Sequence, residues 1–329
     1  MIGFHGTTLS DELKEMIGEF GIGGVIIFSR NIESKEQIKE LCYSLQRFSV
    51  QNNEIPLFIS IDQEGGRVFR LKSPFRQYPS SAELGRIGSE AIVNSNALSM
   101  ADELLEIGIN MNMAPVLDVN TNTENPIIGD RSFSPDPDVV SHLSACVIRA
   151  FHEKGIIAVG KHFPGHGDTS SDSHIELPVV NHRIERLEEI EFKPFIHALK
   201  TGLRAVMTAH VLYPELDPHY PATLSEVIIN GILRERQGFD GVVITDDMEM
   251  KAISNRYTIE DAGILSIHAG ADILLICHSR DKQLTMHESL LEAVEGGEIE
   301  EERIDKSLNR LIKLKKDFIK TTPLFVSRG

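Results

Sequence analysis

The sequence predicts an α/β fold, a (β/α)8 TIM-type barrel that forms a single domain over residues 1–329 with its active site at the C-terminal ends of the strands. Three observations support this prediction. Short apolar runs alternate with longer amphipathic segments, the runs are apolar on both faces, and polar side chains follow the ends of the runs. The length of 329 residues also fits one such barrel, which takes roughly 250 to 400 residues.

Seven runs have the length of a strand and are mostly apolar on both faces, which is typical of parallel strands covered by helices. They are residues 24–28, 57–61, 111–116, 157–161, 205–208, 241–245 and 273–276. Residues 1–5 are a weaker candidate for an eighth strand. Strands that alternate with helices in this way predict one parallel sheet.

The segments between these runs have the pattern of amphipathic helices. Ser10 is a residue type that caps helix N-termini, so a helix is expected to begin at Asp11. From Ser34 to Phe48, apolar residues recur at helical spacing. Further helices are expected over residues 85–107, 136–153, 186–201, 223–236, 258–269, 280–295 and 301–318.

Polar residues directly after the strands favour a closed barrel over an open sheet. They are Asp62 and Glu64, Asp118 and Asn120, Lys161 and His162, His210, Asp246 and Asp247, and His278. In a closed barrel these strand ends converge on one point. In an open doubly wound sheet they would be spread along an edge. Long irregular stretches at 62–84, 117–136 and 162–185 are expected on the same face.

Charge and hydropathy argue against several classes of partner. The chain has 49 acidic and 33 basic residues and a net charge of −16, which argues against nucleic acid or an anionic membrane as the main partner. It has no run of about 18 apolar residues, so no membrane span is expected. The first residues lack the regions of a signal peptide, and the three cysteines are widely spaced. The expectation is a cytoplasmic protein, and the sequence does not indicate an oligomeric state.

The segment richest in ionisable side chains runs from Lys161 to His174 and contains three His, two Asp and one Lys in 14 residues. One interpretation is a metal site, but Gly and Pro surround the histidines and no His pair has helical metal-ligand spacing. Another is acid–base chemistry by His174, because a carboxylate at Asp172 would fix the ring tautomer and raise its basicity. A third is a solvated polar loop. We favour acid–base chemistry with no metal and no cofactor.

Two other segments carry carboxylates at strand ends. Asp246 follows a buried run that would hold its side chain rigidly, as a nucleophile requires. The alternative for Asp246 or Asp247 is a helix N-cap. Residues 60–68 include Asp62 and suit recognition of sugar hydroxyls, because a carboxylate accepts from hydroxyls and an Arg donates to them. A set of salt bridges at the barrel end is the alternative there.

Together these segments resemble glycoside hydrolase family three, and within it the β-N-acetylglucosaminidases that act on cell-wall muropeptides. The matching segments are IDQEGGRV at 61–68, GDRSF at 129–133, KHFPGHGDT at 161–169, DSH at 172–174 and TDDMEM at 245–250. The resemblance covers most of the chain. It implies hydrolysis of terminal β-linked N-acetylglucosamine with retention of configuration, in peptidoglycan recycling.

The resemblance also implies roles for individual residues. The nucleophile is Asp246, and the acid/base dyad is His174 with Asp172. The residues implied to bind substrate are Asp62, Arg70, Arg131, Lys161, His162 and His210. The implied substrate is a small carbohydrate, an N-acetylglucosamine-containing muropeptide or oligosaccharide. Two alternatives stay open: a phosphorylase on the same scaffold, and a metal-dependent barrel hydrolase that uses the His cluster.

Overall fold

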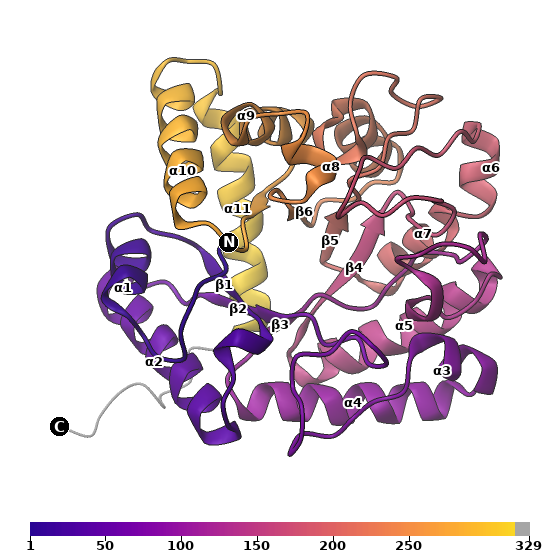
Figure 1. The fold of residues 1–329 in the computed structure, drawn as a ribbon, viewed down its shortest axis with the longest axis horizontal. Coiled ribbons are helices and arrows are strands. Elements are labelled where there is room, and N and C mark those ends of the chain that lie inside the picture. Colours follow the sequence, from indigo (N-terminus) through magenta and orange to yellow (C-terminus); the bar gives the residue numbers. More distant parts are fainter. Residues whose placement is uncertain (320–329) are drawn as a thin grey trace.

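The computed structural model describes residues 1–319 and contains a curled parallel sheet with helices packed around it (Figure 1). Within these residues, seven strands lie in chain order across the sheet, and every neighbouring pair is parallel. They are β1 (Gly24–Ile27), β2 (Phe58–Ile61), β3 (Met111–Asn112), β4 (Ile157–Phe163), β5 (Ala205–Thr208), β6 (Val242–Asp247) and β7 (Ile273–Leu275). The expected α/β fold with one parallel sheet is therefore confirmed.

The first three residues join the two edges of this sheet. The backbone N–H of Ile2 donates to the carbonyl of Gly24 at 3.1 Å, and the carbonyl of Ile2 accepts from Ile26 at 2.9 Å. On the other side, the N–H of Gly3 donates to the carbonyl of Ile276 at 2.9 Å. The weak strand expected over residues 1–5 is thus reduced to a bridging residue between β1 and the end of β7.

The helices occupy the connections between strands. They are α1 (Asp11–Gly18), α2 (Lys35–Asn53), α3 (Ser81–Ile87), α4 (Glu90–Glu106), α5 (Pro137–Lys154), α6 (Ile184–Glu189), α7 (Phe192–Thr201), α8 (Lys251–Ser254), α9 (Ile259–Ala269), α10 (Arg280–Glu295) and α11 (Glu301–Phe318), with a π-helix over Val227–Arg236. Ser10 caps α1 as expected, because its side chain accepts from the N–H of Leu13. Residues 320–329 lie outside the described part, so a single domain over 1–329 stays a prediction.

Several further elements differ from the sequence prediction. The helix expected over 223–236 is a 3-10 turn at Ala222–Leu224 followed by the π-helix that begins at Val227. The helix expected over 85–107 is two helices, because Gly88 ends α3 in the left-handed region at a φ of +67° and Ser89 caps α4. The helix expected over 186–201 begins earlier and breaks before Glu191, a buried residue whose carboxylate pairs with Arg186. Strand β3 stops well before residue 116, since Pro115 has no N–H for the ladder.

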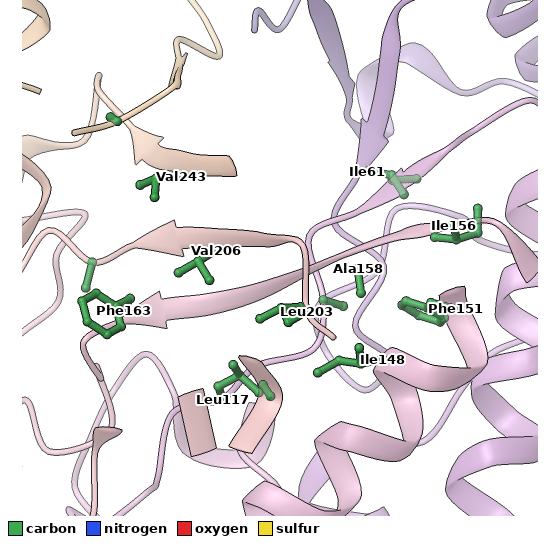
Figure 2. Packing of buried hydrophobic residues seen from close by; sticks show 14 of the residues in the cluster. Ile61, Leu117, Ile148, Phe151, Ile156, Ala158, Phe163, Leu203, Val206 and Val243 are labelled. Atoms are coloured by element: carbon green, nitrogen blue, oxygen red, sulfur yellow. The ribbon is translucent and has the colours of Figure 1, made fainter. Parts of the chain in front are cut away.

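Strand side chains alternate between an inner and an outer cluster, as period-two geometry requires. The inner cluster includes Ile26, Phe58, Met111, Ile157, Val159, Ala205, Met207, Ile244 and Leu275. Leu314 of α11 belongs to it, and the neighbouring Lys315 donates to the carbonyl of Gly23 just before β1. The outer cluster packs against the helices. Figure 2 shows part of it, where Ile148 and Phe151 of α5 lie near Ala158 of β4. The strands are therefore covered on both faces.

We predict that Phe151→Ala lowers the free energy of unfolding by about 3–5 kcal/mol, because it leaves a cavity between α5 and the sheet. Phe151 is only 1% exposed. Equilibrium urea unfolding measures the change. Ile92→Ala on α4 is the control, since Ile92 is 43% exposed and we expect its loss to be within about 0.5 kcal/mol. Equal losses in the two variants would contradict the packing described for α5.

Candidate active site

Seven of the nine residues assigned from the sequence line one cavity of about 240 Å³ at the carboxyl ends of the strands. They are Asp62, Arg70, Arg131, Lys161, His162, His174 and Asp246. Ile26, Met207 and Leu275, which belong to the inner cluster, also line this cavity. The strands therefore bring together side chains that lie as much as 184 positions apart in the chain (Asp62 and Asp246).

A second, larger cavity of about 900 Å³ lies at the other end of the sheet. Residues that precede strands line it, among them Pro56, Asn110, Gly155 and Arg204. None of the nine assigned residues lines it. Size alone would select this larger cavity, whereas the placement of the assigned ionisable groups favours the smaller one.

A buried cluster of ion pairs forms one wall of the site. Nζ of Lys161 lies 2.9 Å from Oδ1 of Asp62 and 2.7 Å from Oε1 of Glu64. Arg131 binds Glu64 through two bonds of 2.8 Å, and Arg70 lies 3.1 Å from Oδ2 of Asp62. Burial alone would raise the pKa of the Glu64 carboxyl, but Arg131 and Lys161 hold that pKa well below its ordinary value. The pKa of Asp62 is lowered for the same reason, with burial opposed by Lys161 and Arg70.

His162 is held by a buried carboxylate. Its Nδ1 lies 2.7 Å from Oδ2 of Asp118, and its backbone N–H donates to Oδ1 of Asp118 at 3.1 Å. Its Nε2 lies 3.4 Å from Arg131, which can only donate. The Nδ1 proton therefore points to Asp118, and Nε2 is an acceptor in the neutral ring. Burial opposes the charge on Asp118, but His162 lowers the pKa of this carboxyl.

Asp246 is the residue before the last in strand β6, where its Oδ1 accepts from the N–H of Asp247 at 2.8 Å. Burial would raise the pKa of Asp246, but His210 and His162 bring it below its ordinary value. The carboxyl is therefore ionised near neutral pH. An ionised carboxylate fixed at a strand end has the chemistry of a nucleophile.

His210 does not line the cavity, although the sequence assigned it to substrate binding. It is fully buried, and its Nε2 donates to the carbonyl of Asp247 at 2.9 Å. Its Nδ1 lies 2.8 Å from the hydroxyl of Thr223. Burial is the main cause that lowers the pKa of the ring. In this structure His210 stabilises the end of β6 through its bond to the carbonyl of Asp247, outside the residues that line the cavity.

Asp172 and His174 form a pair on the loop after β4. Nδ1 of His174 lies 2.8 Å from Oδ1 of Asp172, which also accepts the backbone N–H of His174 at 2.7 Å. The side chain of His174 is 63% exposed. Since Nδ1 faces the carboxylate, Nε2 is the atom left to exchange a proton.

Neither carboxylate of the pair at 246–247 caps a helix. The N-cap position of α8 is Met250, which has no side-chain capping bond. Asp247 instead accepts from the backbone N–H groups of Glu249 and Cys277 at 3.1 and 3.2 Å, and its Oδ2 lies 3.2 Å from Nε2 of His278. Burial raises the pKa of Asp247 to about 7. Its role is to fasten the segment after β6 to the segment after β7.

Sequence reasoning did not assign roles to Glu64, Asp118 and His278. Glu64 and Asp118 hold Lys161, Arg131 and His162, and His278 lines the cavity. Each of the three is a polar residue that follows a strand. That position was the available signal, and it does not separate a residue that holds its neighbours from one that meets substrate.

Within residues 1–319, no group of three or more His, Cys, Asp or Glu side chains is placed to hold a metal ion. Among the same residues, no helix has both the length and the apolar character needed to cross a membrane.

Comparison with known proteins identifies the family. Residues 2–314 match the model described as the glycosyl hydrolase family 3 N terminal domain. The chain belongs to this family. The membership expected from the five sequence segments is therefore confirmed.

Among curated relatives in this family, the beta-hexosaminidase A of Pseudoalteromonas piscicida is 37% identical over 94% of the chain and 56% of its own length. The beta-hexosaminidase of Idiomarina loihiensis is 36% identical over 90% of the chain and 88% of its own length. The glycosyl hydrolase family 3 chain thus spans little more than half of the first relative and most of the second.

Solved structures of similar proteins have the same fold. A glycoside hydrolase family 3 beta-N-acetylglucosaminidase from Paenibacillus sp. str. FPU-7 is 43% identical with a TM-score of 0.96, over 100% of this chain and 63% of that one. A beta-N-acetylhexosaminidase from Beutenbergia cavernae is 27% identical with a TM-score of 0.89, over 96% of both chains.

We predict that Glu64→Gln destabilises the protein by about 3–5 kcal/mol at pH 7, because it leaves Lys161 and Arg131 buried without one of their anions. The pKa of Glu64 is lowered on folding, so its contribution is complete above its ordinary pKa of 4.5 and falls as the pH drops below that value.

The gap in urea-unfolding free energy between the parent and Glu64→Gln should therefore narrow from pH 5 to pH 3. The exposed Glu288→Gln on α10 is the control for loss of one carboxylate. A gap that stays constant over this range would show that the charge of Glu64 is not what the cluster requires.

Proposed function

We propose that this chain is a retaining β-N-acetylglucosaminidase with Asp246 as nucleophile and His174, oriented by Asp172, as acid and base. The observation that carries the proposal is the meeting of an ionised strand-end carboxylate and a carboxylate-anchored imidazole at one cavity. Membership in glycosyl hydrolase family 3 and the names of the relatives, beta-hexosaminidase and beta-N-acetylglucosaminidase, support it.

The first step forms a glycosyl ester. An oxygen of Asp246 attacks the anomeric carbon while the bond to the leaving oxygen breaks, and Nε2 of His174 gives its proton to that oxygen. In the second step, Nε2 takes a proton from water, the water oxygen attacks the anomeric carbon, and the bond to Asp246 breaks. Two inversions give net retention. Asp172 stabilises the imidazolium and fixes its tautomer.

The ion-pair wall would hold the sugar. Asp62 is 17% exposed and its oxygens keep acceptor capacity for hydroxyl groups. Arg70, also partly exposed, supplies donors beside it. Lys161, His162 and Arg131 complete the set of polar side chains along the cavity. Because these groups are already paired and buried, they need little reorganisation when substrate binds.

We also propose that the sheet closes as a (β/α)8 barrel, with the bridging residues at 1–3 in the place of the eighth strand. Their hydrogen bonds to both sheet edges support this. An N-acetylglucosamine-containing muropeptide or oligosaccharide is the proposed substrate, in the cytoplasm and in peptidoglycan recycling. The family resemblance of the sequence supports this choice.

We predict that Asp246→Ala lowers kcat for p-nitrophenyl β-N-acetylglucosaminide by ~10³-fold or more, because the covalent route is lost. The parent should prefer this substrate to the β-glucoside, with a chelator present and phosphate absent. Asp240→Asn, which changes an exposed carboxylate just before β6, is the matched control and should retain activity. Release that requires metal or phosphate, or that survives Asp246→Ala, would remove the proposal.

We predict that His174→Ala slows substrates with poor leaving groups by about 10²–10⁴-fold, the range of general acid catalysis. Substrates with good leaving groups should lose far less in the first step, because their oxygen departs without a proton. Kinetics of kcat/KM over a series of aryl β-N-acetylglucosaminides measures the difference. A loss that is the same for every leaving group would argue against His174 as the acid.

A further inference from the structure

His166 is a buried residue that the proposed mechanism does not use. It is 1% exposed and lies between two glycines in the loop after β4. Its backbone N–H donates to Oδ1 of Asp118 at 2.7 Å, so it shares with His162 the carboxylate behind the ion-pair wall. The two rings lie with centroids 5.7 Å apart. His166 thus shares its support with His162, and both residues line the cavity.

The ring of His166 bonds on both sides. Nδ1 lies 2.9 Å from Oγ1 of Thr169, and Nε2 lies 3.0 Å from Oγ of Ser173. Thr169 donates to the carbonyl of His166 at 3.1 Å and accepts from Asn125 at 3.1 Å. The hydroxyl proton of Thr169 is used in the bond to the carbonyl of His166, so Thr169 can only accept from Nδ1–H of the ring. Nε2 then has no proton and accepts a hydrogen bond from the hydroxyl of Ser173. Burial lowers the pKa of His166 to about 4, which keeps the ring neutral for this arrangement.

Ser173 is the residue between the two members of the dyad. It is 2% exposed, whereas the side chains of Asp172 and His174 are 26% and 63% exposed. Its carbonyl accepts from the N–H of Ala252 in α8 at 3.2 Å. Ala252 follows Asp246 by only six residues. Ser173 therefore attaches the exposed dyad to the body through two bonds, one to His166 and one to the segment that continues from β6.

We propose that His166 is a positioning residue for the acid/base dyad, which it places over Asp246 by holding the hydroxyl of Ser173. This inference rests on the proposed function, because it needs His174 to be the acid. A shift of the dyad by about 1 Å would cost on the order of 10²-fold in rate. That cost should fall on the step in which His174 transfers a proton. In this scheme His166 acts through Ser173 on the dyad and not on the reacting atoms, although it lines the same cavity.

The test is the leaving-group series applied to Ser173→Ala, which removes one hydroxyl, and to His166→Ala. We expect kcat/KM for poor leaving groups to fall about 10–100-fold, while the best leaving groups change less than about twofold. His166→Gln should recover part of the loss, because its amide reaches toward the Ser173 hydroxyl. Ser144→Ala on α5 is the control for a buried serine, and His182→Gln is the control for a different histidine contact of this loop, the one to Asp168.

A double-mutant cycle with His174→Ala distinguishes positioning from a general structural role. If His166 and Ser173 act through His174, then Ser173→Ala adds no further loss in the His174→Ala background. An equal loss for all leaving groups, or a loss that persists in that background, overturns the inference.

The same series separates the two levels of the argument. Suppose that the loss of kcat/KM depends on the leaving group for His174→Ala but not for Ser173→Ala. Then only the proposed positioning of the dyad by His166 and Ser173 is wrong. If the loss for His174→Ala does not depend on the leaving group either, both the assignment of His174 as the acid and the positioning role of His166 are wrong.

Discussion

The burial of paired charge is the constraint on which this structure depends. Lys161 lies between Asp62 and Glu64, and Glu64 also holds Arg131, so four charges leave water together. Desolvation costs several kcal/mol for each ion, and it is offset only if every ion has its partner at hydrogen-bond distance. These residues come from the ends of β2 and β4 and from the loop after β3. The strands must therefore keep their register for the pairs to form, which couples the order of the sheet to the shape of the cavity.

The two groups proposed for catalysis are supported in different ways. Asp246 is in a buried strand, where it accepts from the N–H of Asp247 and where His210 donates to the carbonyl of Asp247. His174 is on an exposed part of the loop after β4, next to the buried Ser173 that bonds to His166. A nucleophile has to return to the same position in both steps, whereas an acid that later acts as a base has to admit first an aglycone and then water. A rigid strand end suits the first requirement and an exposed loop suits the second.

The sequence was sufficient for the order of the strands and for seven of the nine assigned residues to meet at one cavity. Runs that are apolar on both faces indicate burial, and the polar residues after them mark the strand ends. The sequence was insufficient where contacts with other residues determine the end of an element or the role of a side chain. The break at Gly88 depends on a left-handed residue and a cap, and the short β3 depends on a proline within a run that is otherwise apolar. Glu64 and Asp118 were visible, but their role comes from the partners that long loops bring to them. Loop packing has no periodic pattern that a single sequence displays.

The bridging residues at 1–3 have a consequence for how the chain acquires its structure. Ile2 bonds to β1 nearby, but the bond from Gly3 to Ile276 closes a loop of almost the whole described chain. Contacts between residues so far apart in the chain form late in folding. Closing the long loop costs conformational entropy before the contact contributes any stabilisation. During synthesis, the segment that joins the two sheet edges is made well before Ile276, its partner just after β7. One edge of the growing sheet therefore stays open until the last strand arrives, and this is the interval in which the chain is most exposed to pairing with the wrong strand.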